Sequence, residues 1–94
     1  MKLSWSDEAL AELSTIIFYI AKDNPNAAAT LAERIYSRAE KLLLDHPLIG
    51  RTGRVNETFE LVINSSYILV YNIKNNQIKI LSIRHTARLW PKKF

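Results

Sequence analysis

The chain has 94 residues, of which 48% are hydrophobic and 23% are charged, as is typical of one globular domain. It has no cysteine and two histidines, which excludes a disulfide framework and a thiolate zinc site, so we expect no metal cluster. No apolar run approaches the ~20 residues of a membrane span and no signal-peptide core is present, so we expect a cytoplasmic, single-domain protein (residues 1–94) with no membrane contact.

Charge is divided unevenly along the chain. Residues 1–45 carry five Lys or Arg against seven Asp or Glu, a net charge of −2, whereas residues 46–94 carry eight against two, a net charge of +6. A basic half on a chain with an isoelectric point near 9.6 indicates an anionic partner, either nucleic acid or an acidic protein segment. A moderately basic, solvated surface explains the same numbers, and charge alone does not separate these interpretations.

The first elements are a short strand and a helix. Residues 2–5 alternate between polar and apolar, as in a strand. Ser6 is a good N-cap, and two acidic residues follow it in the first turn, where the helix dipole favours anions. Apolar residues at spacings of three and four then predict a helix to about residue 22, with a stripe of Leu10, Leu13, Ile17 and Ile20.

A second helix begins close behind the first. Asn24 is suited to the N-cap and Pro25 to the first helical position. The predicted helix carries an apolar stripe of Ala28, Leu31, Ala32, Ile35, Ala39, Leu42 and Leu43. His46 precedes Pro47 and therefore ends the helix, because the residue before proline avoids helical conformation. The short connection predicts an antiparallel helical hairpin.

The pattern changes to period two after Val55, with many β-branched residues. Strands are predicted at residues 59–63, 67–73 and 77–83, with turns at residues 64–66 and 75–76, because Asn tolerates positive φ. The resulting order is β-α-α-β-β-β. We therefore expect an α+β fold in which the helical hairpin packs on an antiparallel sheet of three or four strands.

Candidate functional residues are concentrated after the second helix. Arg84, His85 and Arg88 follow the last predicted strand, and Arg51 and Arg54 lie on the glycine-containing loop before the sheet. Guanidinium groups match phosphate or carboxylate geometry, and histidine exchanges protons near neutral pH. These residues are therefore candidates for binding a target or a phosphate, with His85 and Arg88 as candidate catalytic residues.

Structural roles compete with each of these functional interpretations. Arg88 is also suited to pair with Glu60 or with a helix carboxylate, and His85 is suited to form a hydrogen bond at a strand end. Arg51 and Arg54 are consistent with a solvated loop. His46 is expected at the surface, and Trp5 is expected to pack between strand and helix. Tyr67 and Tyr71 are expected to lie on one face of a strand, packed in the core.

Several local sequences, in this order, resemble the ParE/RelE superfamily of type II toxin–antitoxin toxins. The resemblance covers nearly the whole chain and rests on residues 5–9, 19–21, 47–51, 53–55, 60–62, 67–71 and 85–91. It implies a toxin that a cognate antitoxin neutralises in a hetero-oligomer, with no metal or cofactor. Trp90 and Pro91 either dock the chain end on the core or bind the antitoxin. The closing sequence, residues 85–91, resembles the ParE-like branch.

The two branches of the superfamily imply different targets. RelE-like members cleave mRNA on the ribosome, whereas ParE-like members are associated with poisoning DNA gyrase. RelE-like nucleases carry an arginine where this chain has Ile68, and lysines on the preceding strand, where it has Glu60 and Val62. The resemblance therefore favours ParE-like interference with gyrase or replication. A ribosome-dependent endoribonuclease centred on His85 and Arg88 remains the alternative.

The chain also departs from the ParE-like pattern. Members commonly have Gly-Thr-Arg-Glu-Leu at the entry to the first strand of the sheet, whereas this chain has Glu57 in place of the glycine and Phe59 in place of the arginine. Loss of that arginine removes one cation from the expected basic surface. A third hypothesis is therefore an attenuated toxin that only binds its antitoxin.

Overall fold

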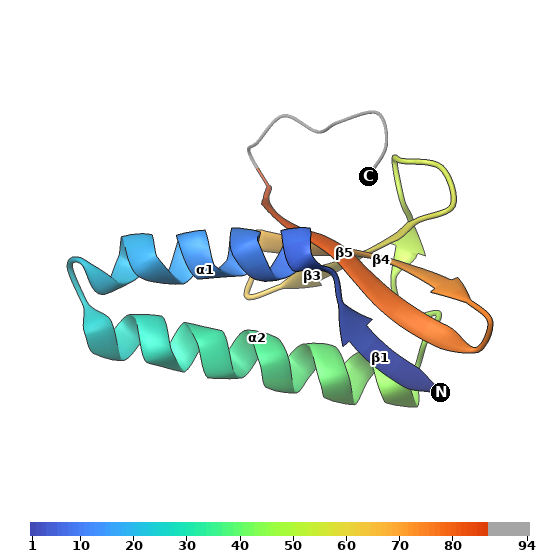
Figure 1. The fold of residues 1–94 in the computed structure, drawn as a ribbon, viewed down its shortest axis with the longest axis horizontal. Helices are drawn as coiled ribbons and strands as arrows, with labels where there is room; N and C mark the ends of the chain where they lie inside the picture. The colour runs from blue at the N-terminus through green and yellow to red at the C-terminus, as the bar shows by residue number, and fades with distance from the viewer. Residues whose placement is uncertain (87–94) are drawn as a thin grey trace.

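The computed structural model describes residues 1–86 (Figure 1). The chain follows the predicted order, with one additional short strand. The elements are β1 (Lys2–Trp5), α1 (Asp7–Ala21), α2 (Pro25–Asp45), β2 (Arg51–Thr52), β3 (Phe59–Ile63), β4 (Tyr67–Lys74) and β5 (Gln77–His85). Neither helix in this part of the chain combines the length and apolarity needed to cross a membrane.

Both helices begin at the predicted N-caps. The Ser6 side chain accepts a hydrogen bond of 3.0 Å from the backbone N–H of Ala9, and Asn24 accepts one of 3.0 Å from Ala27. These bonds satisfy donors that the first helical turn leaves without a partner. One predicted stripe residue was wrong, because Leu10 is 38% exposed and Ala9 is buried in its place.

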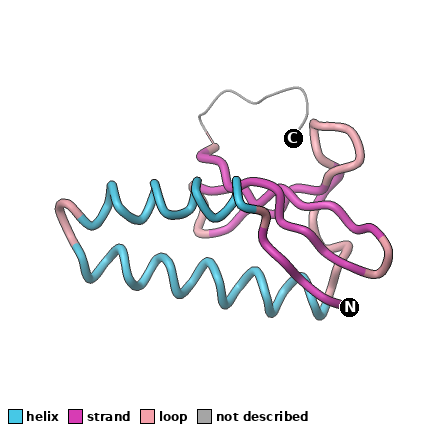
Figure 2. Tube along the Cα trace, viewed as in Figure 1, coloured by secondary structure: helices cyan, strands magenta, loops and turns pink. Residues whose placement is uncertain are grey.

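The two helices form the expected antiparallel hairpin, and the sheet lies beside its open end (Figure 1). The core lies between the hairpin and one face of the sheet. Its helical part is made by Ala9, Leu13, Leu31, Ile35, Ala39 and Leu43. The closed end of the hairpin extends beyond the strands (Figure 2). Trp5 packs against Tyr36 of α2 with ring centroids 5.1 Å apart, which confirms its expected place between strand and helix.

The sheet has five strands in the order β1-β5-β4-β3-β2, rather than the three or four expected. It is also mixed rather than antiparallel, because β1 pairs in parallel with β5. The fifth strand is β2, in which Arg51 and Thr52 pair with Glu60 and Phe59. The predicted loop therefore contains a short edge strand. The parallel pairing was not predictable from local pattern, since it joins the two ends of the described chain.

The sheet has a core face and a second face, which we call the far face. Leu61, Leu69 and Ile83 are aligned across three strands, and all three pack in or against the core. By strand alternation, the residues between them lie on the far face. These far-face residues are Glu60, Val62, Ile68, Val70, Ser82 and Arg84. A register shift between Val70 and Tyr71 marks a bulge in the β4–β5 pairing.

Positive φ angles mark the tight turns of the sheet. Asn75 and Asn76 have φ angles of 52° and 60°, which confirms the predicted hairpin turn. Asn64 and Ser65 make the other predicted turn, with φ angles of 54° and 57°. Glu57 has a φ of 62°, in the left-handed region where a side chain is disfavoured. This is the position at which the family resemblance implied glycine.

We therefore expect Glu57→Gly to stabilise the protein by up to about 1 kcal/mol, because glycine adopts this conformation without steric cost. Chemical denaturation monitored by circular dichroism measures the change. Asn56→Gly is the matched control, because Asn56 is also exposed but has no positive φ, and glycine there only adds freedom to the unfolded chain. A Glu57→Gly variant less stable than the parent would contradict the assignment of strain to this residue.

Candidate functional site

The loop between α2 and β3 carries two of the predicted arginines and is held at its start by Tyr71. The Tyr71 hydroxyl donates a hydrogen bond of 2.9 Å to the carbonyl of Pro47 and accepts one of 3.0 Å from the backbone N–H of Gly50. Burial raises the pKa of this phenol above its usual value, while the Gly50 N–H acts in the opposite direction. Tyr71 thus fixes the loop to the core.

Gly50 is required by this close approach. A Cβ atom at this position would lie 2.6 Å from the Tyr71 hydroxyl and 2.8 Å from the Glu60 carbonyl oxygen. Phe59 supports the same tyrosine from β3, with stacked rings whose centroids are 5.4 Å apart. Phe59 therefore packs against the core rather than replacing a cation on the far face.

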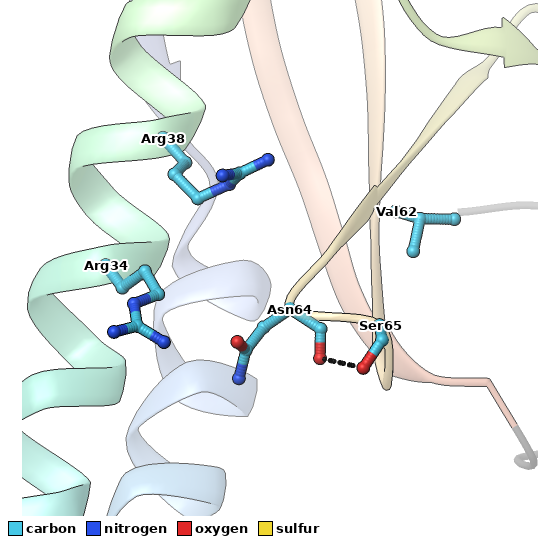
Figure 3. Close-up of a pocket in the computed structure, with 5 residues that line it drawn as sticks. All are labelled: Arg34, Arg38, Val62, Asn64 and Ser65. Carbon is cyan, nitrogen blue, oxygen red and sulfur yellow. Dashed lines mark hydrogen bonds between the residues drawn. The ribbon is translucent and has the colours of Figure 1, made fainter.

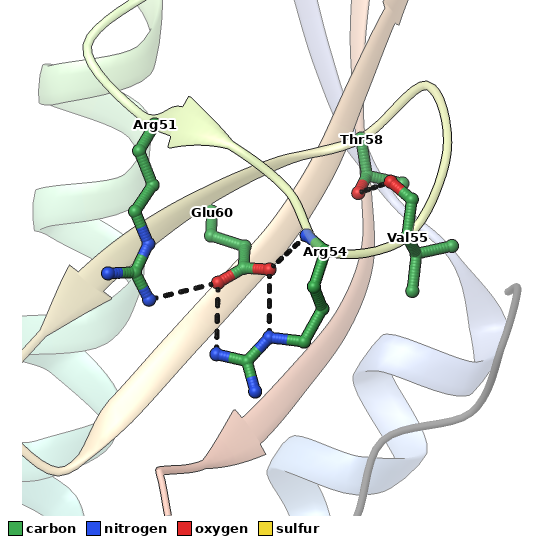
Figure 4. A network of polar contacts seen from close by, with 5 residues as sticks. All are labelled: Arg51, Arg54, Val55, Thr58 and Glu60. Carbon is green, nitrogen blue, oxygen red and sulfur yellow. Dashed lines mark hydrogen bonds and ion pairs between the residues drawn. The ribbon is translucent and has the colours of Figure 1, made fainter.

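The far end of the loop is organised around the buried carboxylate of Glu60, shown in Figure 4. Arg51 Nη2 donates to one carboxylate oxygen at 3.1 Å. Arg54 donates through its backbone N–H at 2.8 Å, through Nε at 3.2 Å and through Nη2 at 3.4 Å. The Glu60 side chain is 2% exposed, whereas those of Arg51 and Arg54 are 61% and 45% exposed. One carboxylate thus gathers two surface guanidinium groups.

These contacts keep Glu60 ionised. Burial by itself would raise the pKa of the Glu60 carboxyl. The backbone N–H of Arg54 and then the guanidinium groups of Arg54 and Arg51 outweigh burial, so the pKa lies below its usual value. The cluster keeps a net charge of +1. Arg51 and Arg54 were predicted to bind an anionic target, but in the structure both guanidinium groups form ion pairs with the Glu60 carboxylate.

The predicted cluster at the end of β5 is divided between the two faces of the sheet. The strand extends through His85, so Arg84 and His85 are neighbours on a strand and face opposite sides. Arg84 lies on the far face, where it donates 3.0 Å to a Glu12 carboxylate oxygen, and Ser82 donates 2.7 Å to the other oxygen. His85 lies on the other side, edge-on to Tyr67 at 5.6 Å. The structure therefore does not bring Arg84 and His85 together as one site.

The two ion-pair clusters are also apart from each other. Glu60 and Ser82 are both aligned with Val70, so one cluster lies on each side of β4. Two strand spacings separate them, about 10 Å.

The predicted residues Arg88, Trp90 and Pro91 lie outside the described residues, so their placement stays a prediction. His46 is exposed, as expected. Among residues 1–86, no group of three His, Asp or Glu side chains is arranged to hold a metal ion.

The centre of the far face is aliphatic. Ile68 is 3% exposed and aligned between Val62 and Arg84, and Val70 is fully buried. Tyr67 and Tyr71 lie on the opposite, core side, as predicted. The central far-face positions on β3 and β4 are thus occupied by isoleucine, valine and a carboxylate, where a phosphate-binding sheet would carry cations.

Sequence reasoning missed two surfaces on the helical hairpin. The first is an apolar face where Phe18 and Tyr19 are both 72% exposed, beside a groove of about 340 Å³ that Ile17, Phe18 and Tyr36 help to line. The second is a pair of exposed arginines on α2, Arg34 and Arg38. The second surface was hidden because the first half of the chain is acidic overall. The sequence did contain a signal for this surface, because two like charges four residues apart lie on the same face of a helix.

The architecture defines the protein as a small α+β domain with a helical hairpin on a mixed sheet. Among solved structures, a chain from the chromosomal ParDE toxin–antitoxin system of P. aeruginosa has this fold, with a TM-score of 0.81 over 90% of this chain and 95% of that chain. The two sequences are 23% identical, so this likeness concerns the fold.

Sequence comparison gives the family. The family model described as the ParE toxin of type II toxin–antitoxin systems (parDE) matches residues 3–90. A candidate toxin of Sinorhizobium fredii, Y4kP, is 38% identical over 91 residues, covering 96% of this chain and 93% of that protein. Toxin RelE2 of Caulobacter vibrioides is 35% identical over 85 residues, covering 90% of this chain and 94% of that protein.

The chain therefore belongs to the ParE toxin family of type II toxin–antitoxin systems. It is a toxin component, and its partner is an antitoxin protein. The resemblance inferred from the local sequences, and the α+β fold expected from them, are both confirmed.

Proposed function

We propose that this toxin arrests growth by blocking DNA gyrase or another replication function through protein contacts in the cytoplasm. The composition of the far face carries the proposal. RNA cleavage needs a proton acceptor, a proton donor and a cation on the phosphate. At the far-face positions within residues 60–62, 68–70 and 82–84, the one cation is Arg84, which pairs with Glu12, and the one carboxylate is Glu60, which pairs with Arg51 and Arg54.

The exposed charge supports action through protein contacts. Arg51 and Arg54 project from a loop held rigidly by Tyr71 and Glu60, and their guanidinium groups remain about half exposed. A protein target with a carboxylate would gain charge-assisted hydrogen bonds to guanidinium groups that are already oriented. Gyrase would be recognised by this preorganised loop.

We infer that the antitoxin covers the apolar face of the helical hairpin in a toxin–antitoxin hetero-oligomer. Exposed aromatic side chains such as Phe18 and Tyr19 are unusual on a free monomer and are typical of binding sites. The groove of about 340 Å³ beside them suits the apolar side of an amphipathic segment that folds on binding. Lys22 next to the aromatic residues favours an acidic segment.

A supercoiling assay with purified gyrase tests the proposed target. We expect excess toxin to suppress the conversion of relaxed plasmid to supercoiled plasmid. Ile35→Asp is the negative control, because it places a carboxylate in the core and unfolds the chain. Unchanged supercoiling at large toxin excess would refute gyrase as the target.

The attenuated-toxin hypothesis rested on Phe59 in place of an arginine. Because Phe59 stacks on Tyr71 and packs against the core, Phe59→Arg would change stability as well as charge. Growth inhibition by the unmodified chain is therefore the direct test of attenuation. Arrest of growth would exclude the attenuated toxin.

A further inference from the structure

A row of cations on α2 lies beside the turn between β3 and β4. Arg34 and Arg38 line a surface hollow of about 460 Å³ together with Val62, Asn64 and Ser65. Figure 3 shows the Arg38 guanidinium extending from the helix toward the strands, and the Arg34 guanidinium beside the helix on the side where the Asn64 side-chain amide lies. Lys41 continues the row one turn further and is also exposed. We call Arg34, Arg38 and Lys41 the α2 row.

The two arginines of the α2 row have no ion-pair partner in the part of the chain that the structure describes. None of the residues three or four positions from Arg34 or Arg38 along the helix is Asp or Glu. No carboxylate of residues 1–86 forms an ion pair with either guanidinium. Like charges four residues apart repel each other on a helix surface, so an external anion would stabilise this arrangement. The Arg51 and Arg54 guanidinium groups differ, because Glu60 already neutralises part of their charge.

The spacing and lining of the hollow favour a chain of phosphates. Arg34 and Lys41 are seven residues apart, about 10 Å along the helix. A nucleic-acid strand carries one charge per roughly 3.4 Å of rise, so the row spans the rise of roughly three nucleotide steps. The lining is polar apart from Val62. Protein surfaces that bind a nucleic-acid backbone are typically polar and cationic, whereas surfaces that bind a peptide have an apolar centre.

We propose that the α2 row is a binding site for the phosphate backbone of nucleic acid. Arg34 and Arg38 each bind a phosphate, and the Asn64 amide donates a further hydrogen bond in the hollow. The site reads no sequence, since all its donors serve the backbone. The central positions of the far face lack the cations that would bind a phosphate. The α2 row is a separate site that would keep the toxin close to nucleic acid. This inference does not depend on gyrase being the target.

Fluorescence anisotropy with a labelled 16-base-pair DNA duplex, measured over a series of salt concentrations, tests the site. The variant is Arg34→Gln/Arg38→Gln. The matched control is Lys74→Gln/Lys79→Gln, which removes the same charge at exposed lysines outside the hollow. We expect the arginine variant alone to lower the slope of log affinity against log salt by about 2, since each phosphate contact contributes about 0.9. Between 50 and 200 mM salt the parent should therefore weaken about tenfold more than the arginine variant.

Several results would overturn the proposal. Equal losses in the arginine variant and the lysine control would assign binding to overall charge. Tighter binding of inorganic phosphate than of DNA would identify a site for a small ion. A glutamate-rich peptide is also added at a charge concentration equal to that of the DNA. Displacement of the DNA from the parent by this peptide, without binding of the peptide to the arginine variant, would identify an acidic-peptide site instead. Growth inhibition is measured for the same variants, so that loss of DNA binding and loss of toxicity are observed separately.

Discussion

Glu60→Ala is expected to lower the free energy of unfolding by about 3 kcal/mol, and the melting temperature by roughly 12–24 °C for a domain of this size. The carboxylate is buried and accepts four hydrogen bonds from Arg51 and Arg54. Alanine leaves the backbone N–H of Arg54 without its acceptor and removes the anion that holds two like charges together. The arginines remain partly solvated, which limits the loss.

Arg51→Ala is the matched control for this change, because it removes one donor from the same cluster at a side chain that is 61% exposed. Exposed ion pairs contribute little, so this variant should lose less than about 1 kcal/mol. Urea denaturation at neutral pH measures both variants. Equal losses, or a loss below 1 kcal/mol for Glu60→Ala, would show that the carboxylate is not the organising centre of the loop.

The same carboxylate predicts a pH dependence. Its pKa is lower in the folded protein than the ordinary value of 4.5, so ionisation of Glu60 favours the folded state. This contribution is complete above pH 4.5 and is lost as the pH falls through the folded-state pKa. The stability difference between the parent and Glu60→Gln should therefore be constant near neutral pH and shrink below pH 4.5. A difference that grew in acid would contradict the direction of the shift.

Gly50→Ala is expected to destabilise the protein by about 2–3 kcal/mol. A Cβ atom here would meet the Tyr71 hydroxyl at 2.6 Å and the Glu60 carbonyl oxygen at 2.8 Å. Because the second atom is backbone of β3, it cannot move without shifting the sheet. The loop would be displaced, and with it the two hydrogen bonds of Tyr71 to residues 47 and 50.

A double-mutant cycle with Tyr71→Phe gives the control. Phenylalanine removes the hydroxyl that the new methyl group would meet, so Gly50→Ala should cost less in the Tyr71→Phe background than in the parent. Thermal denaturation of the four proteins measures the coupling. Strictly additive losses would show that the loop does not depend on this contact.

Most of the fold was predictable from local chemistry. Ser6 and Asn24 cap the two helices as predicted, because their side chains accept hydrogen bonds from backbone N–H groups of the first turn. Asn75 and Asn76 adopt the positive φ angles of the predicted turn. These features depend on neighbours within four residues. The parallel pairing of β1 with β5 joins residues about 75 positions apart, for which the chain has no local signal.

The environments of the candidate functional residues were harder to predict, because they depend on which face of the sheet a residue lies on and on its partners. Arg84 and His85 are adjacent in sequence, and the extension of β5 through both residues sends them to opposite sides of the sheet. Arg51 and Arg54 were recognised as cations, but their shared partner Glu60 depends on the pairing of β2 with β3. Arg34 and Arg38 were hidden within a half of net charge −2, since a sum over residues does not distinguish one helix face from another.

We propose that this family member arrests growth without cutting RNA. Induced expression of the chain in bacteria, with one abundant mRNA probed for cleavage during the arrest, is the decisive test. We expect growth to stop, with filamentation and a DNA-damage response, while the mRNA remains intact. Arrest accompanied by fragmented mRNA would contradict the claim and make His85 and Arg88 the first residues to mutate.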